Sequence, residues 1–97
     1  MIKLSSKDAC HTRSQNVKVS ASLAQLRKAI GDENTRNNDT GKDWTCETEE
    51  GDVFTIYLWN YLGRPGINEV VEWHIGAHSG YVAYTAAEEI YKLIQND

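Results

Sequence analysis

The chain has 97 residues, of which 40% are hydrophobic and 25% charged, and its formal net charge is -4. This length suits one small domain, and the ordinary composition excludes a wholly disordered protein. No stretch approaches the roughly 18 to 20 apolar residues of a membrane span, and residues 1–4 are followed by polar residues instead of the apolar region of a signal peptide. We therefore expect a single domain over residues 1–97, located in the cytoplasm.

The charge is unevenly distributed along the chain. Residues 1–31 carry six basic residues and one acidic residue, whereas residues 32–97 carry four basic and thirteen acidic residues. Such a division is typical of proteins that place a basic arm on nucleic acid or an acidic surface on a basic partner. Packing of the basic start against the acidic remainder explains it equally well, and that arrangement needs no partner.

The N-terminal residues show little regular pattern. Residues 5–16 have no hydrophobic periodicity, so residues 1–19 are expected to form a loose arm, with a short edge strand at residues 17–19.

A short helix is expected next. Ser22 and Gln25 form a capping box, in which each side chain bonds to the backbone amide of the other residue, and this box predicts a helix over about residues 22–30. Gly31 then supplies the left-handed conformation in which many helices end. Residues 32–42 contain turn-forming residues and few large apolar ones, so they predict a solvated loop.

Three antiparallel strands are expected in the middle of the chain. A period-two alternation runs through three sets of residues: Trp44, Cys46 and Thr48; Phe54, Ile56 and Leu58; Val71, Trp73 and Ile75. A three-residue loop at residues 49–51 places Cys46 opposite Phe54 and Trp44 opposite Ile56, so that the apolar side chains share one face. A turn at residues 63–66 precedes the third strand.

The last element is predicted to be a helix. Its start is open between Ser79, which follows the strand directly, and Thr85, which begins a capping box of its own. The apolar spacing favours the earlier start, and it is carried by Val82, Ala86, Ile90, Leu93 and Ile94. The expected fold is therefore α+β: a three-stranded antiparallel meander with two helices on one face, in the order α-β-β-β-α.

Two segments resemble a pattern of small uncharacterised proteins of phages and mobile elements. They are Phe54-Thr55-Ile56-Tyr57-x-Trp59, similar to an FTIYDWK-like strand, and Glu72-Trp73-His74-Ile75-Gly76-x-His78-Ser79, similar to a WHIGGHS-like segment before a final helix. The similarity covers roughly residues 44–90. It departs at Leu58, Asn60 and Ala77, where the pattern has Asp, Lys and Gly. The resemblance implies a phage or mobile-element accessory protein in the host cytoplasm, with an anti-CRISPR-like inhibition of a host defence system as the expected role.

The histidines and cysteines resemble a set of zinc ligands, but their positions in the predicted strands argue against a metal site. His74 and His78 could bind zinc together with Cys46 or with Cys10 and His11. Strand parity places Cys46 and His74 on opposite faces, which argues against shared zinc ligation and against a nucleophile and base pair. Cys46 is expected to be a small buried hydrophobe, and a disulfide with Cys10 is not expected in the cytosol. We expect no metal and no cofactor.

The turn between the third strand and the last helix is a candidate anion site. Exposed backbone amides at residues 76–80 can hold a phosphate, and Arg64, His78 and Ser79 are the side chains expected to assist. Turns of this kind are also common in proteins without a ligand, and the chain has no Walker lysine or spaced glycine fingerprint. A small-ligand or nucleotide-binding protein that uses this turn is the alternative function.

The outer face of the sheet, together with the acidic first hairpin, is the stronger candidate. Tyrosine and tryptophan are the residues that most often anchor protein interfaces. The expected partner-binding residues are Tyr57, Trp59, Glu47, Glu49, Glu50, Asp52, Glu72 and His74. The alternative is that the N-terminal arm or the first helix covers this face, which would turn the aromatic residues into a second small core.

These observations favour a non-enzymatic protein-binding module. Its partner would be another protein, either a host defence complex or a second copy of the chain. The aromatic face lacks basic residues, which argues against nucleic acid. Strand parity brings no acid, base and nucleophile together, which argues against an enzyme.

Overall fold

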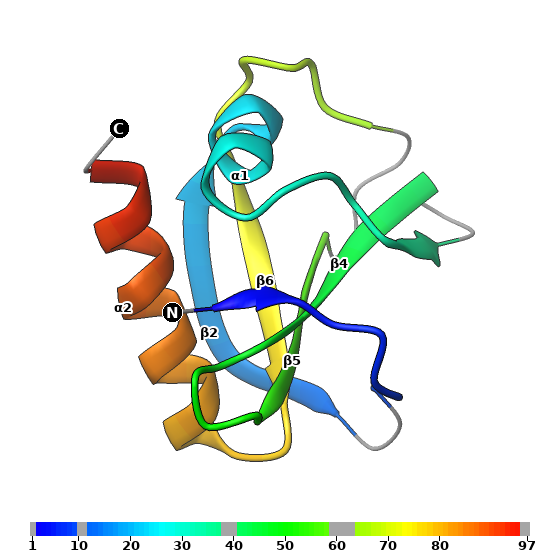
Figure 1. Cartoon of the computed structure of the whole chain (residues 1–97). Coiled ribbons are helices and arrows are strands. Elements are labelled where there is room, and N and C mark those ends of the chain that lie inside the picture. The colour runs from blue at the N-terminus through cyan, green and yellow to red at the C-terminus, as the bar shows by residue number, and fades with distance from the viewer. Residues whose placement is uncertain (1, 10–11, 38–40, 59–63, 96–97) are drawn as a thin grey trace.

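The computed structural model describes residues 2–9, 12–37, 41–58 and 64–95 (Figure 1). Its elements in chain order are β1 (Lys3–Leu4), β2 (Arg13–Ala21), α1 (Leu23–Ala29), β3 (Thr35–Asn37), β4 (Gly41–Glu47), β5 (Val53–Tyr57), β6 (Val71–Ala77) and α2 (Gly80–Gln95). Within the described part of the chain, neither helix is long and apolar enough to cross a membrane.

The strands form an antiparallel sheet in the order β1-β4-β5-β6-β2, and β3 pairs with β4 off this path. The α+β class fits the structure, but the prediction of a three-stranded meander is wrong. The meander β4-β5-β6 gains β1 along the edge of β4 and β2 along the edge of β6. An edge strand presents a row of unpaired backbone N–H and C=O groups, and the N-terminal segment pairs with these groups on both sides.

The strand β2 replaces much of the expected loose arm. Its second half alternates apolar residues toward the core, with Val19 and Ala21 fully buried. Its first half is polar, and the register with β6 shifts between Ser14 and Val17, where Asn16 has a φ of 59°. A polar, bulged half-strand carries no period-two signal, which explains why the sequence predicted only residues 17–19 as a strand.

The solvated loop predicted at residues 32–42 is also wrong in part. It contains β3 and the first residues of β4, which pair in the register Thr35 to Asp43 and Asn37 to Gly41. β3 and the first three residues of β4 are polar, so the backbone ladder pairs them without an apolar pattern.

Several local predictions are confirmed. Cys46 lies opposite Phe54 and Trp44 lies opposite Ile56, as side-chain parity required. The Ser22 capping box is present, and Gly31 has a φ of 122° after the end of α1.

The start of α2 also follows the prediction. The helix begins at Gly80, and the amide of Val82 donates to the hydroxyl of Ser79 at 3.2 Å. The earlier of the two predicted starts is therefore correct, and Thr85 lies inside the helix.

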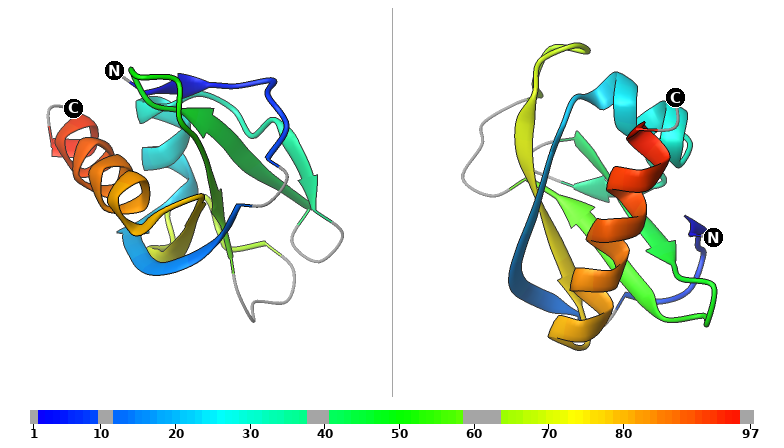
Figure 2. Two further views of the ribbon diagram at one scale, coloured as in Figure 1. Left: turned by 90° about the horizontal axis from the view of Figure 1, so that it is seen from below. Right: turned by 90° about the vertical axis from the view of Figure 1, so that its left-hand side faces the viewer.

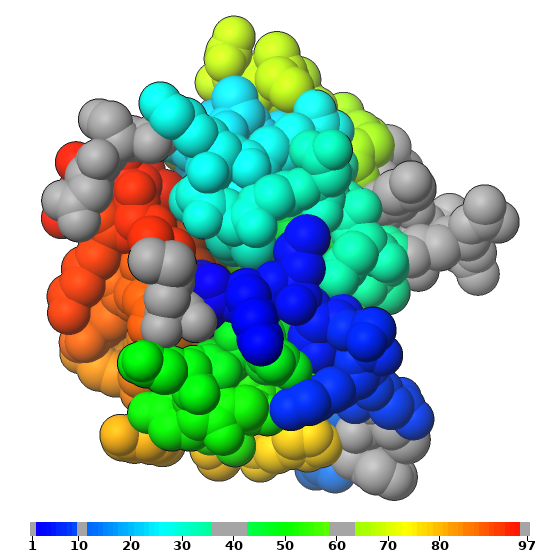
Figure 3. All heavy atoms as spheres, viewed as in Figure 1, coloured from blue at the N-terminus to red at the C-terminus, as the bar shows by residue number. Residues whose placement is uncertain are grey.

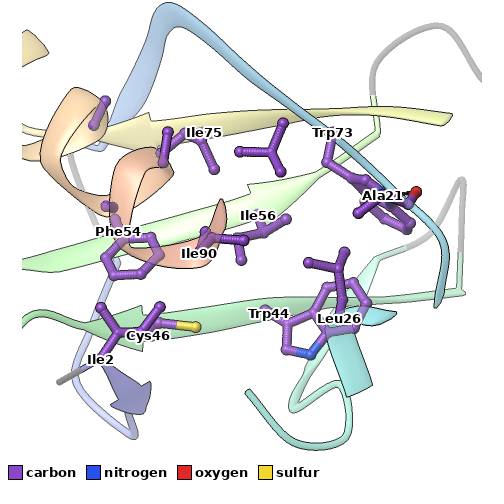
Figure 4. Packing of buried hydrophobic residues seen from close by; sticks show 14 of the residues in the cluster. Ile2, Ala21, Leu26, Trp44, Cys46, Phe54, Ile56, Trp73, Ile75 and Ile90 are labelled. Carbon is purple, nitrogen blue, oxygen red and sulfur yellow. Dashed lines mark hydrogen bonds between the residues drawn. The ribbon is translucent and has the colours of Figure 1, made fainter. Parts of the chain in front are cut away.

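Both helices pack on one face of the sheet (Figures 1 and 2). Trp44 and Trp73 pack at the end of the core that contains Leu26 of α1, with ring centroids 5.2 Å apart and ring planes at 83° (Figure 4). Their indole N–H groups donate to the carbonyls of Gly31 and Ala21, each at 2.9 Å. Both tryptophans are therefore buried with their polar atoms paired.

The helix α2 crosses the sheet closely because its buried side chains are small. Ala83, Ala86 and Ala87 face the core, and Ile90 is the largest fully buried residue of this helix. The opposite side of α2 is left to solvent, and this leaves Tyr81 and Tyr84 exposed.

Candidate functional site

The outer face is the side of the sheet opposite the core, and its β4 half is covered. Glu47, expected to bind a partner, is only 9% exposed. Its carboxylate accepts a hydrogen bond from the Ser5 hydroxyl at 3.0 Å and pairs with Lys7 at 3.1 Å and Lys3 at 3.2 Å. The bonds from Lys7, Ser5 and Lys3 lower the pKa of Glu47. The N-terminal segment therefore binds the Glu47 carboxylate, and Glu47 is not part of the exposed acidic surface.

Asn34 joins the N-terminal segment to β4. Its side-chain amide donates to the carbonyls of Ser5 and Thr45, at 3.1 and 2.9 Å, and its oxygen accepts from the Thr45 amide at 2.8 Å. Figure 3 shows the N-terminal residues in blue against the hairpin residues in green. The alternative that the N-terminal arm covers the outer face is thus correct for its β4 half, whereas α1 packs on the core face.

The basic start of the chain is partly neutralised within the molecule. Lys3 and Lys7 pair with Glu47, and Arg27 pairs with Glu33. The internal-packing explanation of the charge division accounts for these three cations.

On the β5 and β6 half of the outer face, Tyr57 and His74 pack together. Their ring centroids are 5.7 Å apart with the planes tilted by 31°, and both side chains are half-buried. A Cβ atom added to Gly76 would come within 2.5 Å of the Thr55 hydroxyl and 3.3 Å of the Tyr57 ring. Tyr57 therefore lies over Gly76, and both aromatic residues already have partners inside the domain. Glu72 is exposed on this face, and Trp59 lies outside the described residues.

The surroundings of His74 predict a pH-dependent stability. Burial and the positive charge of Lys18 lower the pKa of His74, and Glu72 only partly opposes them. As the pH falls below about 6.5, the unfolded chain therefore takes up this proton before the folded chain does, and the free energy of unfolding falls. Stability from neutral His74 is fully present above that pH and is lost as the pH falls through the lower folded-state pKa.

Urea unfolding between about pH 7.5 and pH 5.5 measures this effect. The variant His74→Gln should show a flatter pH dependence than the wild type. The carboxyl groups of Glu33 and Glu47 have lowered pKa values and titrate below this window. An equal slope for variant and wild type would contradict the assignment to His74.

The residues of the predicted anion site do not come together. The Ser79 hydroxyl accepts from the Val82 amide and so caps α2, while His78 is exposed. Arg64 precedes the start of β6, whereas residues 78 and 79 follow its end, and the Arg64 guanidinium pairs with Glu33. Glu33 also binds Arg27 through two bonds, of 2.8 and 2.9 Å. Arg64 is therefore part of an ion-pair network that holds α1 and the segments around it.

Cys46 is unsuited to catalysis or metal binding. It is a free cysteine with no exposed surface, and burial raises the pKa of its thiol to about 12. It faces the core, whereas His74 lies on the outer face beside Tyr57. Among the described residues there is no group of three His, Cys, Asp or Glu that could hold a metal. Cys10 and His11 lie outside the described residues.

The most exposed aromatic residues lie on α2. Tyr81 is 79% exposed and Tyr84 is 61% exposed, one turn apart on the solvent side of the helix. A hydrogen bond to Glu88 raises the pKa of Tyr84. The first turns of α2 lie beside the β4–β5 hairpin, whose Glu50 and Asp52 are exposed (Figures 1 and 3). We call Glu50, Asp52, Tyr81 and Tyr84 the tyrosine–acid surface.

The hairpin acids were predicted from the sequence as binding residues, but these tyrosines were not. The signal was present in the helical period: positions 81, 84, 88 and 91 fall on the side of α2 opposite Ala83, Ala86 and Ile90. Tyr91 is less available than the other two, because its hydroxyl accepts a hydrogen bond from the Ser20 amide of β2 at 3.1 Å.

Comparisons of the chain with models of protein families, with curated proteins and with solved structures gave no match.

Proposed function

We propose that the chain is a non-enzymatic protein-binding module that uses the tyrosine–acid surface. The observation that supports this most is the exposure of Tyr81 and Tyr84, at 79% and 61%, on a helix beside Glu50 and Asp52. Tyrosine supplies a large contact area at a low entropy cost, and a helix holds it in place before binding. An adjacent acidic rim adds orientation and faster association.

The choice of α2 over the outer sheet face rests on burial. Tyr57 and His74 contact each other and Tyr57 lies over Gly76, whereas the rings of Tyr81 and Tyr84 lie largely in solvent. A partner on α2 would bury more new aromatic surface than a partner on Tyr57. Of the acidic hairpin residues predicted to bind a partner, Glu50 and Asp52 remain part of the proposed surface.

The resemblance of the β5 and β6 segments to proteins of phages and mobile elements suggests the setting. In the host cytoplasm, the partner would be a component of a defence complex, and binding would inhibit it in an anti-CRISPR-like manner. A second copy of the chain is the other partner that this surface would fit.

Site-specific photo-crosslinking tests the proposal, because it captures a partner whose identity is unknown. The photoreactive residue p-benzoylphenylalanine replaces Tyr81, Tyr84, Tyr57 or Asn68 singly, in the full chain expressed in its host. Asn68 is an exposed position in the turn near α1 and serves as the control. Positions 81 and 84 should each give the same adduct, and position 68 should give none.

The pattern of adducts separates the outcomes. Adducts from position 57 alone would return the binding site to the outer sheet face and overturn the assignment to α2. A lack of adducts at positions 57, 81 and 84 would overturn the binding function itself. An adduct of twice the mass of the chain would identify self-association.

A further inference from the structure

A small pocket lies between the β4–β5 hairpin and the start of α2. Its volume is about 180 Å³, and it is lined by Thr48, Glu50, Asp52, Tyr81, Val82 and Thr85. It belongs to the tyrosine–acid surface, so the inference below rests on the proposed function. The pocket indicates the chemistry of the partner.

Some polar groups of the pocket are bonded within the domain, and others can bond to a ligand. The Thr48 hydroxyl accepts from the Asp52 amide at 3.1 Å, and the Thr85 hydroxyl donates to the Tyr81 carbonyl at 2.8 Å. Among the residues that the structure describes, the carboxylates of Glu50 and Asp52 have no hydrogen-bond or ion-pair partner. The two hydroxyls are therefore used inside the domain, and two negative charges remain for a ligand.

Lys7 reaches the turn of the hairpin, but its ammonium is bound to other groups. The ammonium of Lys7 lies 3.1 Å from the Glu47 carboxylate and 3.1 Å from the Gly51 carbonyl. Lys3 pairs with Glu47 as well, so the two lysines together offset Glu47 and one further negative charge of the hairpin, and Lys7 bonds to neither Glu50 nor Asp52. The charge at the pocket stays negative, in a chain whose formal net charge is -4.

We infer that the partner is a protein that inserts an arginine side chain of a basic segment into this pocket. The guanidinium would bond to Glu50 and Asp52, its plane would stack on the exposed ring of Tyr81, and its aliphatic stem would contact Val82. Arginine combines a fork of donors suited to carboxylates with a planar cation suited to an aromatic face. Among the residues that the structure describes, no third His, Cys, Asp or Glu joins this pair to form a group that could hold a metal ion.

A peptide titration tests this inference on the purified full chain. The probe is an acetylated six-residue peptide of glycine, serine and two arginines, and its matched control carries citrulline in place of arginine. Citrulline keeps the shape of the side chain and removes the charge. In ¹H–¹⁵N correlation spectra, the arginine peptide should shift amides at positions 48–52 and 81–85, and the citrulline peptide should leave them largely unchanged.

Two test variants and one control variant locate the binding determinants. The double substitution Glu50→Gln and Asp52→Asn should weaken peptide binding by about fivefold for each ion pair lost. Glu72→Gln, an exposed carboxylate on the outer sheet face, should leave the affinity unchanged. Tyr81→Ser keeps both carboxylates and should still weaken binding, because the stacking surface is gone.

The outcomes distinguish this inference from the proposed function. Equal binding of the arginine and citrulline peptides, or unchanged binding by the double variant, would overturn the arginine pocket. Photo-crosslinks at positions 81 and 84 would then still support a protein-binding surface of different chemistry. A double variant with a lower melting midpoint and unchanged peptide affinity would show that Glu50 and Asp52 serve the N-terminus of α2 instead, and it would also overturn the inference.

Discussion

Replacing Trp73 with alanine should lower the free energy of unfolding by about 3 to 5 kcal/mol, the range for truncating a buried aromatic residue. Trp73 is fully buried and meets Trp44 edge to face at 5.2 Å. The substitution leaves a cavity in the core and a buried Ala21 carbonyl without the indole donor that now lies 2.9 Å away. For a domain of this size, each kcal/mol of stability lost lowers the melting midpoint by about 4 to 8 °C, so the midpoint should fall by more than about 10 °C.

Urea unfolding followed by far-ultraviolet circular dichroism measures this loss, because it does not depend on tryptophan fluorescence. Trp73→Phe is the matched control: it retains an aromatic ring against Trp44 and lacks the donor to Ala21. The decrease in its free energy of unfolding should be smaller than that of the alanine variant and greater than zero. A Trp73→Ala variant within about 1 kcal/mol of the wild type would show that the core collapses around the missing ring and would contradict this account.

The core was largely predictable because it follows from local pattern. Period two in β4, β5 and β6 identified Trp44, Phe54, Ile56 and Trp73 as residues of one face, and parity selected the correct hairpin register. The edges of the sheet were not predictable in this way. β1 and β3 are two and three residues long, and the first half of β2 is polar. Such segments join a sheet through their backbone groups, which carry no sequence signal.

In the candidate site, too, some features follow from local sequence pattern and others depend on contacts between distant residues. Parity correctly placed Tyr57 and His74 on the face opposite the core, but it could not show that each ring covers the other. Glu47 was predicted on the same face, yet its burial depends on Lys3 and Lys7, which lie far from it in the chain. Contacts between residues far apart in the chain determine which polar side chains are exposed to a partner. Local sequence patterns do not predict these contacts.

The second large effect is expected in binding. Replacing both Tyr81 and Tyr84 with serine should weaken association with the crosslinked partner by about 100-fold or more, because truncation of an interface anchor commonly costs about 2 kcal/mol. Both rings are exposed in the free chain, so the free energy of unfolding should change by no more than about 0.5 kcal/mol. Calorimetry or surface plasmon resonance measures the affinity, and a urea melt of the same sample measures the stability.

Tyr57→Ser provides the opposite pattern and thereby decides between the two aromatic surfaces. Its ring packs on His74 and over Gly76, so its loss should reduce stability by about 1 to 2 kcal/mol and leave partner affinity nearly unchanged. The reverse result, with affinity lost in Tyr57→Ser and retained in the double variant, would move the interface to the sheet. Replacing an exposed tyrosine with serine should lower partner affinity, whereas replacing a half-buried tyrosine should lower the free energy of unfolding. The burial of each tyrosine in the free chain predicts which of the two quantities changes. On that criterion, we expect the tyrosines of α2 to bind the proposed partner and the Tyr57–His74 pair to stabilise the sheet.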